Sequence, residues 1–284
     1  MESLLDHLII LYEAKLAEFE VNFDTATEAG MKHSRDALSA FFFELQEAIV
    51  HPNIFFEIGA FSATTSLALK EALPDTQCFA FEASTYNYTF FQNKYDYEKA
   101  GVNYINAAVS RKPGKKKFYI QKSIDSQEVD KIRANNSLLE RKQQGVEYEE
   151  HWVETYSVDS FVQSKNLSLD GTRISLWIDT EGAAFEVLQG IRSTLKYVQS
   201  ILVEVEEKRY WKKQALAQRT IKYLLQAGFI PVARDFEAPF QYNILFVRPE
   251  TIHRATYKTC RSTYLRSIRK HISAPTDAVN QTLP

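Results

Sequence analysis

Asp179 and Glu181 stand where an apolar segment of the chain ends and a helical pattern begins. Residues 174–178, ISLWI, are mostly apolar, which is typical of a parallel strand covered on both faces. After Gly182, apolar residues recur at helical spacing. Ligands of open α/β sheets bind beyond the carboxyl ends of the strands. The position therefore favours a catalytic role for Asp179 and Glu181, and capping of the helix N-terminus is the alternative.

A second strand, glycine turn and helix is predicted from residue 54 to residue 73, with Gly59 at the turn. A dinucleotide-binding fingerprint needs three glycines in the pattern G-x-G-x-x-G, and only Gly59 is present here. The cradle for a pyrophosphate is therefore missing. This disfavours a nicotinamide-dependent oxidoreductase, whereas a cofactor without phosphates would not need the cradle.

The next two predicted strands end in residues that suit an adenosyl group. Residues 77–81 lead to Glu82, whose carboxylate could accept hydrogen bonds from two ribose hydroxyls. Its alternative role is to cap the helix that begins near Ser84. Residues 102–105 lead to Ala107 and Ala108, which would flank an adenine ring if the first two strands hold the rest of the group.

A third acid, Glu204, lies near the end of the apolar strand at 200–205. Together with Asp179 and Glu181 it could hold a divalent ion such as Mg²⁺, which would lower the pKa of a substrate hydroxyl. Clustered acids can also bind sugar hydroxyls directly, and both readings stay open. The polar stretch 123–150 is predicted to include a binding loop.

Composition predicts one domain with appendages. The chain has 284 residues, of which 45% are hydrophobic, so it can bury a full core. Basic residues predominate from residue 251 onward and acids in the remainder, which argues against a nucleic-acid partner for the body. The basic end is interpreted as a solvated, partly disordered tail, with weak contact to an anionic membrane surface or a protein as the alternative. No membrane span or signal peptide is recognised, so a cytoplasmic location is expected.

Helical patterns over 4–19 and 31–50 precede the first strand. They could form a lid, a packing layer or the contact surface of a homo-oligomer. A hairpin is expected over 108–120, and two closing strands over 229–233 and 243–247. The expected division is a helical extension at 1–50, a catalytic domain at 51–250 and a basic tail at 251–284.

The order of these elements resembles the class I S-adenosylmethionine methyltransferases. Within that class the chain is similar to the FkbM family of O-methyltransferases over about 53–249, through the segments IFFEIGAFSATTS, FAFEAS, NAAVS, NNSLLE, TYSVDSFV, WIDTEGAAFEVLQGI and ILVEVEE. The resemblance implies an α/β, Rossmann-like fold with a mostly parallel seven-stranded sheet, one antiparallel strand and helices on both faces. It also implies methyl transfer from S-adenosylmethionine to a hydroxyl of a sugar, a glycan or another hydroxylated metabolite.

The resemblance assigns roles to individual positions. The cofactor-binding residues would be Glu57, Gly59, Ala60, Ser62, Glu82, Ala83, Ala107, Ala108 and Asp179. Asp179 would stand near the transferred methyl with Glu181 beside it, and the acceptor would contact Asn136, Ser137 and Glu204. Members of the family usually have Asp at the position of Glu57, and Gly-Ala-Asn-x-Gly where this chain has Gly-Ala-Phe-Ser-Ala at 59–63. A non-catalytic partner protein that keeps the fold is therefore the alternative function.

Overall fold

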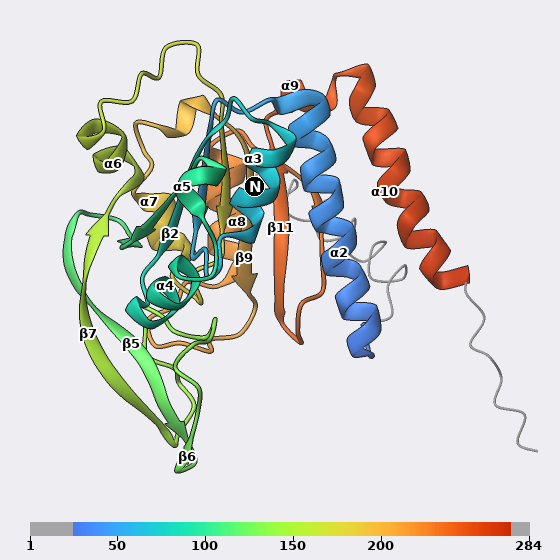
Figure 1. Ribbon diagram of the computed structural model, residues 1–284. Helices are drawn as coiled ribbons and strands as arrows, with labels where there is room; N and C mark the ends of the chain where they lie inside the picture. The colour runs from blue at the N-terminus through green and yellow to red at the C-terminus, as the bar shows by residue number, and fades with distance from the viewer. Residues whose placement is uncertain (1–24, 274–284) are drawn as a thin grey trace, which may run out of the picture.

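The computed structural model describes residues 25–273, and the helix expected over 4–19 lies outside the described residues. Figure 1 shows a twisted central sheet with helices on both sides and a long β-ribbon that extends from one edge. None of the described helices combines the length and the apolar character that a membrane span requires.

The central sheet has seven strands in the order β10-β11-β9-β8-β1-β2-β3. Its strands are β1 (Ile54–Ile58), β2 (Gln77–Glu82), β3 (Val102–Asn106), β8 (Ile174–Ile178), β9 (Val198–Glu206), β10 (Ile230–Arg234) and β11 (Gln241–Val247). All neighbouring pairs are parallel except the two that β11 makes with β9 and β10. The predicted fold class is confirmed. In this topology the carboxyl ends of β1, β2, β3, β8 and β9 meet at one edge of the sheet.

Each face of the sheet is covered by its own helices because successive side chains of a strand point to opposite faces. Phe56 of β1 packs with α6 (Val158–Ser164), α7 (Ala184–Gln189) and α8 (Ala217–Gln226). Phe55, its neighbour, packs in the opposite core. That second core includes buried residues of α2 (Glu28–Leu45), α3 (Thr64–Ala72), α4 (Thr85–Gln92), α5 (Tyr97–Ala100) and α10 (Ala255–Ser273).

The basic C-terminal segment forms a helix, so its interpretation as a solvated, partly disordered tail is wrong for the described part. After β11 the chain continues through α9 (Pro249–Ile252) into α10, which lies beside α2 in Figure 1. Tyr264 of α10 stacks on Phe41 of α2 with ring centroids 4.8 Å apart. Cys260 and Ile268 are buried on the same side. Net charge alone did not predict this packed helix, because a single stripe of apolar residues is enough to pack a basic helix against its neighbour.

Helix α2 packs against the sheet, which is one of the three possibilities expected from the sequence. It continues as a short π-helix, η1 (Gln46–Val50). The side chain of the buried Gln46 accepts hydrogen bonds from serines of two central strands. The Gln46 Oε1 atom accepts from Ser175 Oγ of β8 at 2.6 Å and from Ser200 Oγ of β9 at 3.2 Å. The contacts of α2 and η1 thus extend to the centre of the fold.

A smaller sheet adds β4 (Ala108–Val109), β5 (Gly114–Ile124), β6 (Gln127–Glu128) and β7 (Val146–Tyr156), in the order β4-β7-β5-β6. The expected hairpin over 108–120 is wrong, because β5 pairs with β7 and not with the segment before the turn. The partner strand lies beyond a loop, which local turn signals cannot reveal. Phe118 and Ile120 of β5 pack against Ala83 and Ala108, so this ribbon covers the edge where β2 and β3 end.

Candidate active site

A cavity opens at the carboxyl ends of β1, β2, β3 and β8. It encloses about 590 Å³ of empty space, a volume that includes open solvent at its mouth. It is lined by Ile58, Gly59, Phe61, Phe81, Glu82, Ala83, Ala107, Ala108, Val109, Phe118, Ala134, Asn136, Leu138, Asp179, Thr180, Glu181 and Ala183.

Most of the site residues expected from the sequence line this cavity. They are Gly59, Glu82, Ala83, Ala107, Ala108, Asn136, Asp179 and Glu181. Glu57, Ala60, Ser62, Ser137 and Glu204 are outside the lining. The apolar walls made by Phe61, Phe118 and Leu138 were not foreseen. The segment was expected as part of a hairpin over 108–120, and nothing in the sequence indicated what Phe118 would cover.

Gly59 is required by the close approach of two strand ends. Its φ is +81°, and a Cβ atom placed on it would lie 1.6 Å from the carbonyl oxygen of Asp179. Phe61 and Ala63 also have positive φ, at 48° and 49°. In members of the family Asn and Gly usually stand at these two positions, and both tolerate that conformation more readily than Phe or Ala. Phe61 and Ala63 therefore add backbone strain to this loop.

Glu57 points away from the cavity, toward the start of α3. Its Oε2 atom accepts a hydrogen bond from the backbone N–H of Ser66 at 2.7 Å. The residue at the N-cap, Ala63, has no side chain that could do this, so the carboxylate of Glu57 supplies the cap from the neighbouring strand. Burial raises the pKa of Glu57 to about 7, although the hydrogen bonds from Ser66 act in the opposite direction and lower the pKa.

Glu82 is held at the start of α4, as its alternative capping role predicted, whereas its contact with a ribose stays a prediction. One carboxylate oxygen accepts from the backbone N–H of Phe61 at 2.9 Å, and the other accepts from the N–H of Ser84 at 2.8 Å and from Asn87 Nδ2 at 3.1 Å. It therefore joins the loop after β1 to the start of α4 while it also lines the cavity. Burial raises its pKa to about 7, against these hydrogen bonds.

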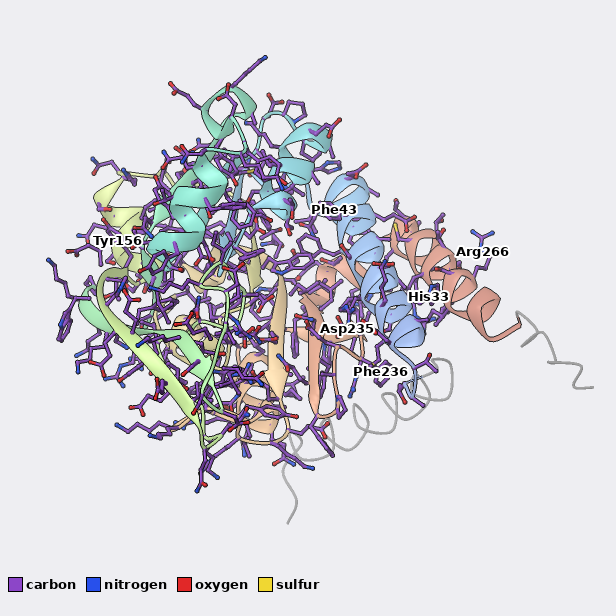
Figure 2. All side chains as sticks on the ribbon, turned by 60° about the horizontal axis from the view of Figure 1, so that its bottom comes forward. His33, Phe43, Tyr156, Asp235, Phe236 and Arg266 are labelled. Carbon is purple, nitrogen blue, oxygen red and sulfur yellow. The ribbon has the colours of Figure 1, made fainter. Side chains whose placement is uncertain are left out.

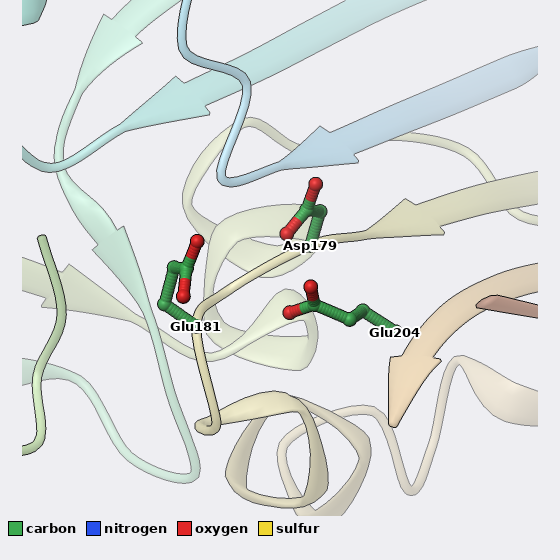
Figure 3. Close-up of side chains that lie close together, drawn as sticks. All are labelled: Asp179, Glu181 and Glu204. Atoms are coloured by element: carbon green, nitrogen blue, oxygen red, sulfur yellow. The ribbon is translucent and has the colours of Figure 1, made fainter. Parts of the chain in front are cut away.

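Asp179, Glu181 and Glu204 converge beside the cavity. Each offers a carboxylate oxygen, and these oxygens lie within 4.8 Å of one another. Figure 3 shows the three side chains pointing toward a common centre, with Asp179 and Glu181 on the turn after β8 and Glu204 on β9. Glu181 has a φ of 50°, and its carbonyl oxygen accepts from Ser137 Oγ at 2.7 Å. Asn136 and Ser137 thus reach the site on the loop where they were expected.

The cluster resists ionisation because its members are buried and like-charged. Burial, followed by the charge of Glu237, raises the pKa of Asp179 to about 7, whereas a hydrogen bond to Glu204 opposes the shift. Burial, followed by the charge of Asp179, raises the pKa of both Glu181 and Glu204 well above the ordinary range. Near neutral pH some of these carboxyls therefore keep protons, and the cluster can take up or release one.

Two further acids extend the cluster toward β10 and β11. Burial raises the pKa of Glu206 and of Asp235 to about 7. Asp235 accepts from the backbone N–H and the side-chain amide of Asn243, at 2.6 and 3.0 Å. The backbone N–H of Phe236, the next residue, donates to Ser34 Oγ of α2. Figure 2 shows Asp235 and Phe236 beside the N-terminal end of this helix. The sequence did not place these two acids at the site, because only the fold puts β11 between β10 and β9.

The cavity fits an adenosyl cofactor without phosphates. Ala107, Ala108 and Phe118 give it apolar walls of the kind that enclose an adenine ring, and Glu82 presents a carboxylate at the tip of β2. Gly59 lets the backbone of the first loop lie against the turn after β8. S-adenosylmethionine has an adenine, a ribose and no phosphate, so the residues that line this cavity suit it.

Two of the solved structures that match this chain, at low sequence identity, are described as methyltransferases. Magnesium protoporphyrin IX methyltransferase from Synechocystis, with bound S-adenosylmethionine, is 11% identical, with a TM-score of 0.41 over 79% of this chain and 84% of that chain. Precorrin-6y C5,15-methyltransferase from Geobacter metallireducens is 12% identical, with a TM-score of 0.34 over 73% and 86%. A search of curated proteins gives no match. The model of the methyltransferase FkbM domain, however, matches residues 53–231. This is more than half of the sequence, and the chain therefore belongs to the FkbM methyltransferase family.

Proposed function

We propose that this protein is an O-methyltransferase that transfers a methyl group from S-adenosylmethionine to a hydroxyl of a sugar, a glycan or another hydroxylated metabolite. One observation carries the proposal. A single cavity is lined by Glu82 and Ala108, which suit an adenosyl group, and also by the buried carboxyls of Asp179 and Glu181, which suit an alcohol. Glu82, Ala83, Ala107 and Ala108 would hold the adenosine part, and Gly59 would lie nearer the methionine part.

S-adenosylmethionine, when bound, supplies an electrophilic methyl group on a sulfonium. The residues of this chain must then bring a hydroxyl into line, accept its proton and exclude water. Asp179 and Glu181 lie on the turn after β8 and line the cavity, so they are placed to receive the acceptor hydroxyl. Phe61, Phe118 and Leu138 add the apolar walls that keep water out.

Asp179 is the proposed proton acceptor. A pKa near 7 makes it a stronger base than an ordinary carboxylate and leaves a large fraction ionised at neutral pH. The Oε2 atom of Glu181 is buried without a hydrogen-bond partner among the described residues. Burial raises the pKa of Glu181 well above its ordinary range, so its carboxyl can keep a proton and donate it to the acceptor oxygen, while the proton of the acceptor hydroxyl faces Asp179. Glu204 contributes through its hydrogen bond to Asp179.

The same three carboxyls are the ligands of the Mg²⁺ site considered above. We propose proton transfer as their role because two of the three carboxyls, Asp179 and Glu204, already have hydrogen-bond partners. Glu204 accepts from Gln241 Nε2 as well as sharing a hydrogen bond with Asp179. A divalent ion would have to replace both contacts.

Calorimetry with S-adenosylmethionine and its demethylated product, S-adenosylhomocysteine, tests the cofactor assignment. Glu82→Gln should weaken binding by about 10- to 100-fold, because it removes the charge that ribose hydroxyls would contact. Glu57→Gln is the matched buried carboxyl, and its position outside the lining predicts affinity close to that of the unaltered protein. No binding of either compound to the unaltered, folded protein would reject the proposal.

The acceptor is sought by mass spectrometry. A panel of sugars and polyols is incubated with the protein and S-adenosylmethionine, and a mass gain of one methyl identifies the acceptor. Asp179→Asn serves as the inactive control. Turnover on amines or thiols, with none on hydroxyls, would contradict O-methylation while leaving the cofactor assignment intact.

A further inference from the structure

Two arginines without a carboxylate partner lie beside the acidic cluster. Arg133 and Arg141 belong to the loop between β6 and β7 and are half-buried. The Nε atom of each is buried and has no hydrogen-bond partner among the described residues, and neither guanidinium forms an ion pair with any carboxylate there. Lys131 on the same loop differs, because it pairs with Glu149 at 2.6 Å.

Arg141 is held next to the turn that carries Glu181. The backbone at residue 141 forms an antiparallel bridge with Trp211, and the guanidinium lies over the indole at 5.0 Å from its centroid. The indole in turn would be 2.8 Å from a Cβ atom on Gly182. A guanidinium that stacks on a ring keeps its N–H groups, which lie in its plane, free for an anion.

The backbone of Arg133 is fixed next to a residue that lines the cavity. Its backbone N–H donates to Asn87 Oδ1 at 3.1 Å, and its carbonyl accepts from Asn87 Nδ2 at 3.0 Å. Asn87 also donates to Glu82, so the position of Arg133 is tied to the tip of β2. The next residue, Ala134, is exposed and lines the cavity.

The two arginines and Glu181 are mutual electrostatic neighbours. The positive charge of Arg141 lowers the pKa of Arg133, second only to burial, and the charge of Glu181 acts in the opposite sense. Arg141 likewise counteracts the rise in the pKa of Glu181. Two like charges that repel each other and have no ion-pair partner are unfavourable unless an anion binds to them.

We propose that Arg133 and Arg141 bind an oxyanion group of the acceptor, a carboxylate or a phosphate, while its hydroxyl lies at Asp179 and Glu181. The inference rests on the proposed function and narrows it to acidic acceptors such as uronic acids or sugar phosphates. Paired guanidinium groups recognise both kinds of oxyanion through parallel N–H···O bonds. The acidic cluster would repel such a group from its own side, so the arginines also fix which end of the acceptor faces the cofactor.

Binding of three related sugars tests this proposal. The protein is first saturated with S-adenosylhomocysteine and then titrated with glucuronate, glucose 6-phosphate and glucose, and binding is followed by ligand-observed NMR. At least one anionic sugar should bind about tenfold more tightly than glucose. The preferred sugar identifies the oxyanion as carboxylate or phosphate. Equal or undetectable binding of all three would overturn the proposal.

Single substitutions then assign the preference to the arginines. Arg133→Gln and Arg141→Gln should each reduce it, with most of it lost in the double variant, and Arg133→Lys should keep part of it. Lys222→Gln removes an equal charge from the exposed side of α8 and should leave the preference unchanged.

The cofactor is the other possible source of a carboxylate at this site. Loss of S-adenosylhomocysteine affinity in the arginine variants would show that they hold the cofactor, and it would overturn the proposal. Absence of cofactor binding to the unaltered protein would instead refute the proposed function, so the two failures are distinguishable.

Discussion

Substitution of Gly59 by alanine should lower the free energy of unfolding more than the same change at a control glycine. The control glycine also has a positive φ, but open space surrounds the added Cβ. Any L-residue at φ +81° costs about 1–2 kcal/mol in left-handed strain. The added Cβ would also lie 1.6 Å from the Asp179 carbonyl oxygen, so strand ends must separate by well over an ångström. Overpacking of this kind typically costs a further 1–3 kcal/mol, roughly. The expected loss is about 2–5 kcal/mol of a total stability that is about 5–15 kcal/mol.

Gly171→Ala is the matched control. Its φ is +67°, and no atom lies within 4 Å of the added Cβ, so only the strain term remains. Urea denaturation of both variants gives the two free energies of unfolding, and their difference isolates the contact with Asp179 at about 1–3 kcal/mol. Calorimetry should show weaker binding of S-adenosylhomocysteine to Gly59→Ala only. A difference below about 0.5 kcal/mol would refute the reasoning that these strand ends are in contact.

Three further outcomes are expected. Stability should fall as pH rises from about 5 to about 7, because burial raises the pKa of Glu57 and Asp235 to about 7. In that interval the folded state holds protons that the unfolded chain has released, so unfolding becomes easier as pH rises. Urea denaturation at pH 5 and pH 8 measures this, and Glu57→Gln should flatten the slope, whereas a rise in stability would contradict the burial argument. Asp179→Asn should lower kcat by about 10²–10⁴-fold, and the kcat of the unaltered protein should rise with pH to a plateau above about 7 as Asp179 loses its proton; a flat profile would exclude Asp179 as the base. Chelation with EDTA should leave methyl transfer unchanged, and activity that is lost on chelation and restored by Mg²⁺ would favour the metal site over proton transfer.

The sequence was sufficient to predict the sheet and the position of the site on it. Continuous apolar runs identify buried parallel strands, and the residues that follow them must meet at one edge. Asp179, Glu82 and Ala108 were found in this way. The family resemblance added Glu57 to the cofactor-binding residues, but a residue inside a strand points to one face only. Glu57 shares the face of Phe55, which is covered by α2 and α3.

The parts that could not be predicted depend on contacts between distant segments. The pairing of β5 with β7 spans a loop, and the position of Arg141 depends on Trp211, which is seventy positions later in the chain. A half-buried arginine and a solvated one have the same sequence signal. The docking of α10 on α2 likewise depends on a stripe of tyrosines and small apolar residues within a segment whose charge dominates its composition.

Gln46 has a consequence for where the catalytic unit begins. Its side chain bridges Ser175 and Ser200, which pair directly where the alignment of β8 and β9 shifts by one residue. The opposite ends of these two strands carry Asp179 and Glu204, so a slip between them would separate the proton-sharing carboxyls. A segment N-terminal to the family match at 53–231 therefore helps to fix the alignment of the two strands that carry the proposed catalytic carboxyls. A shortened protein that starts at the first strand would keep the family signature but lose the side chain that aligns the strands of its proposed catalytic acids.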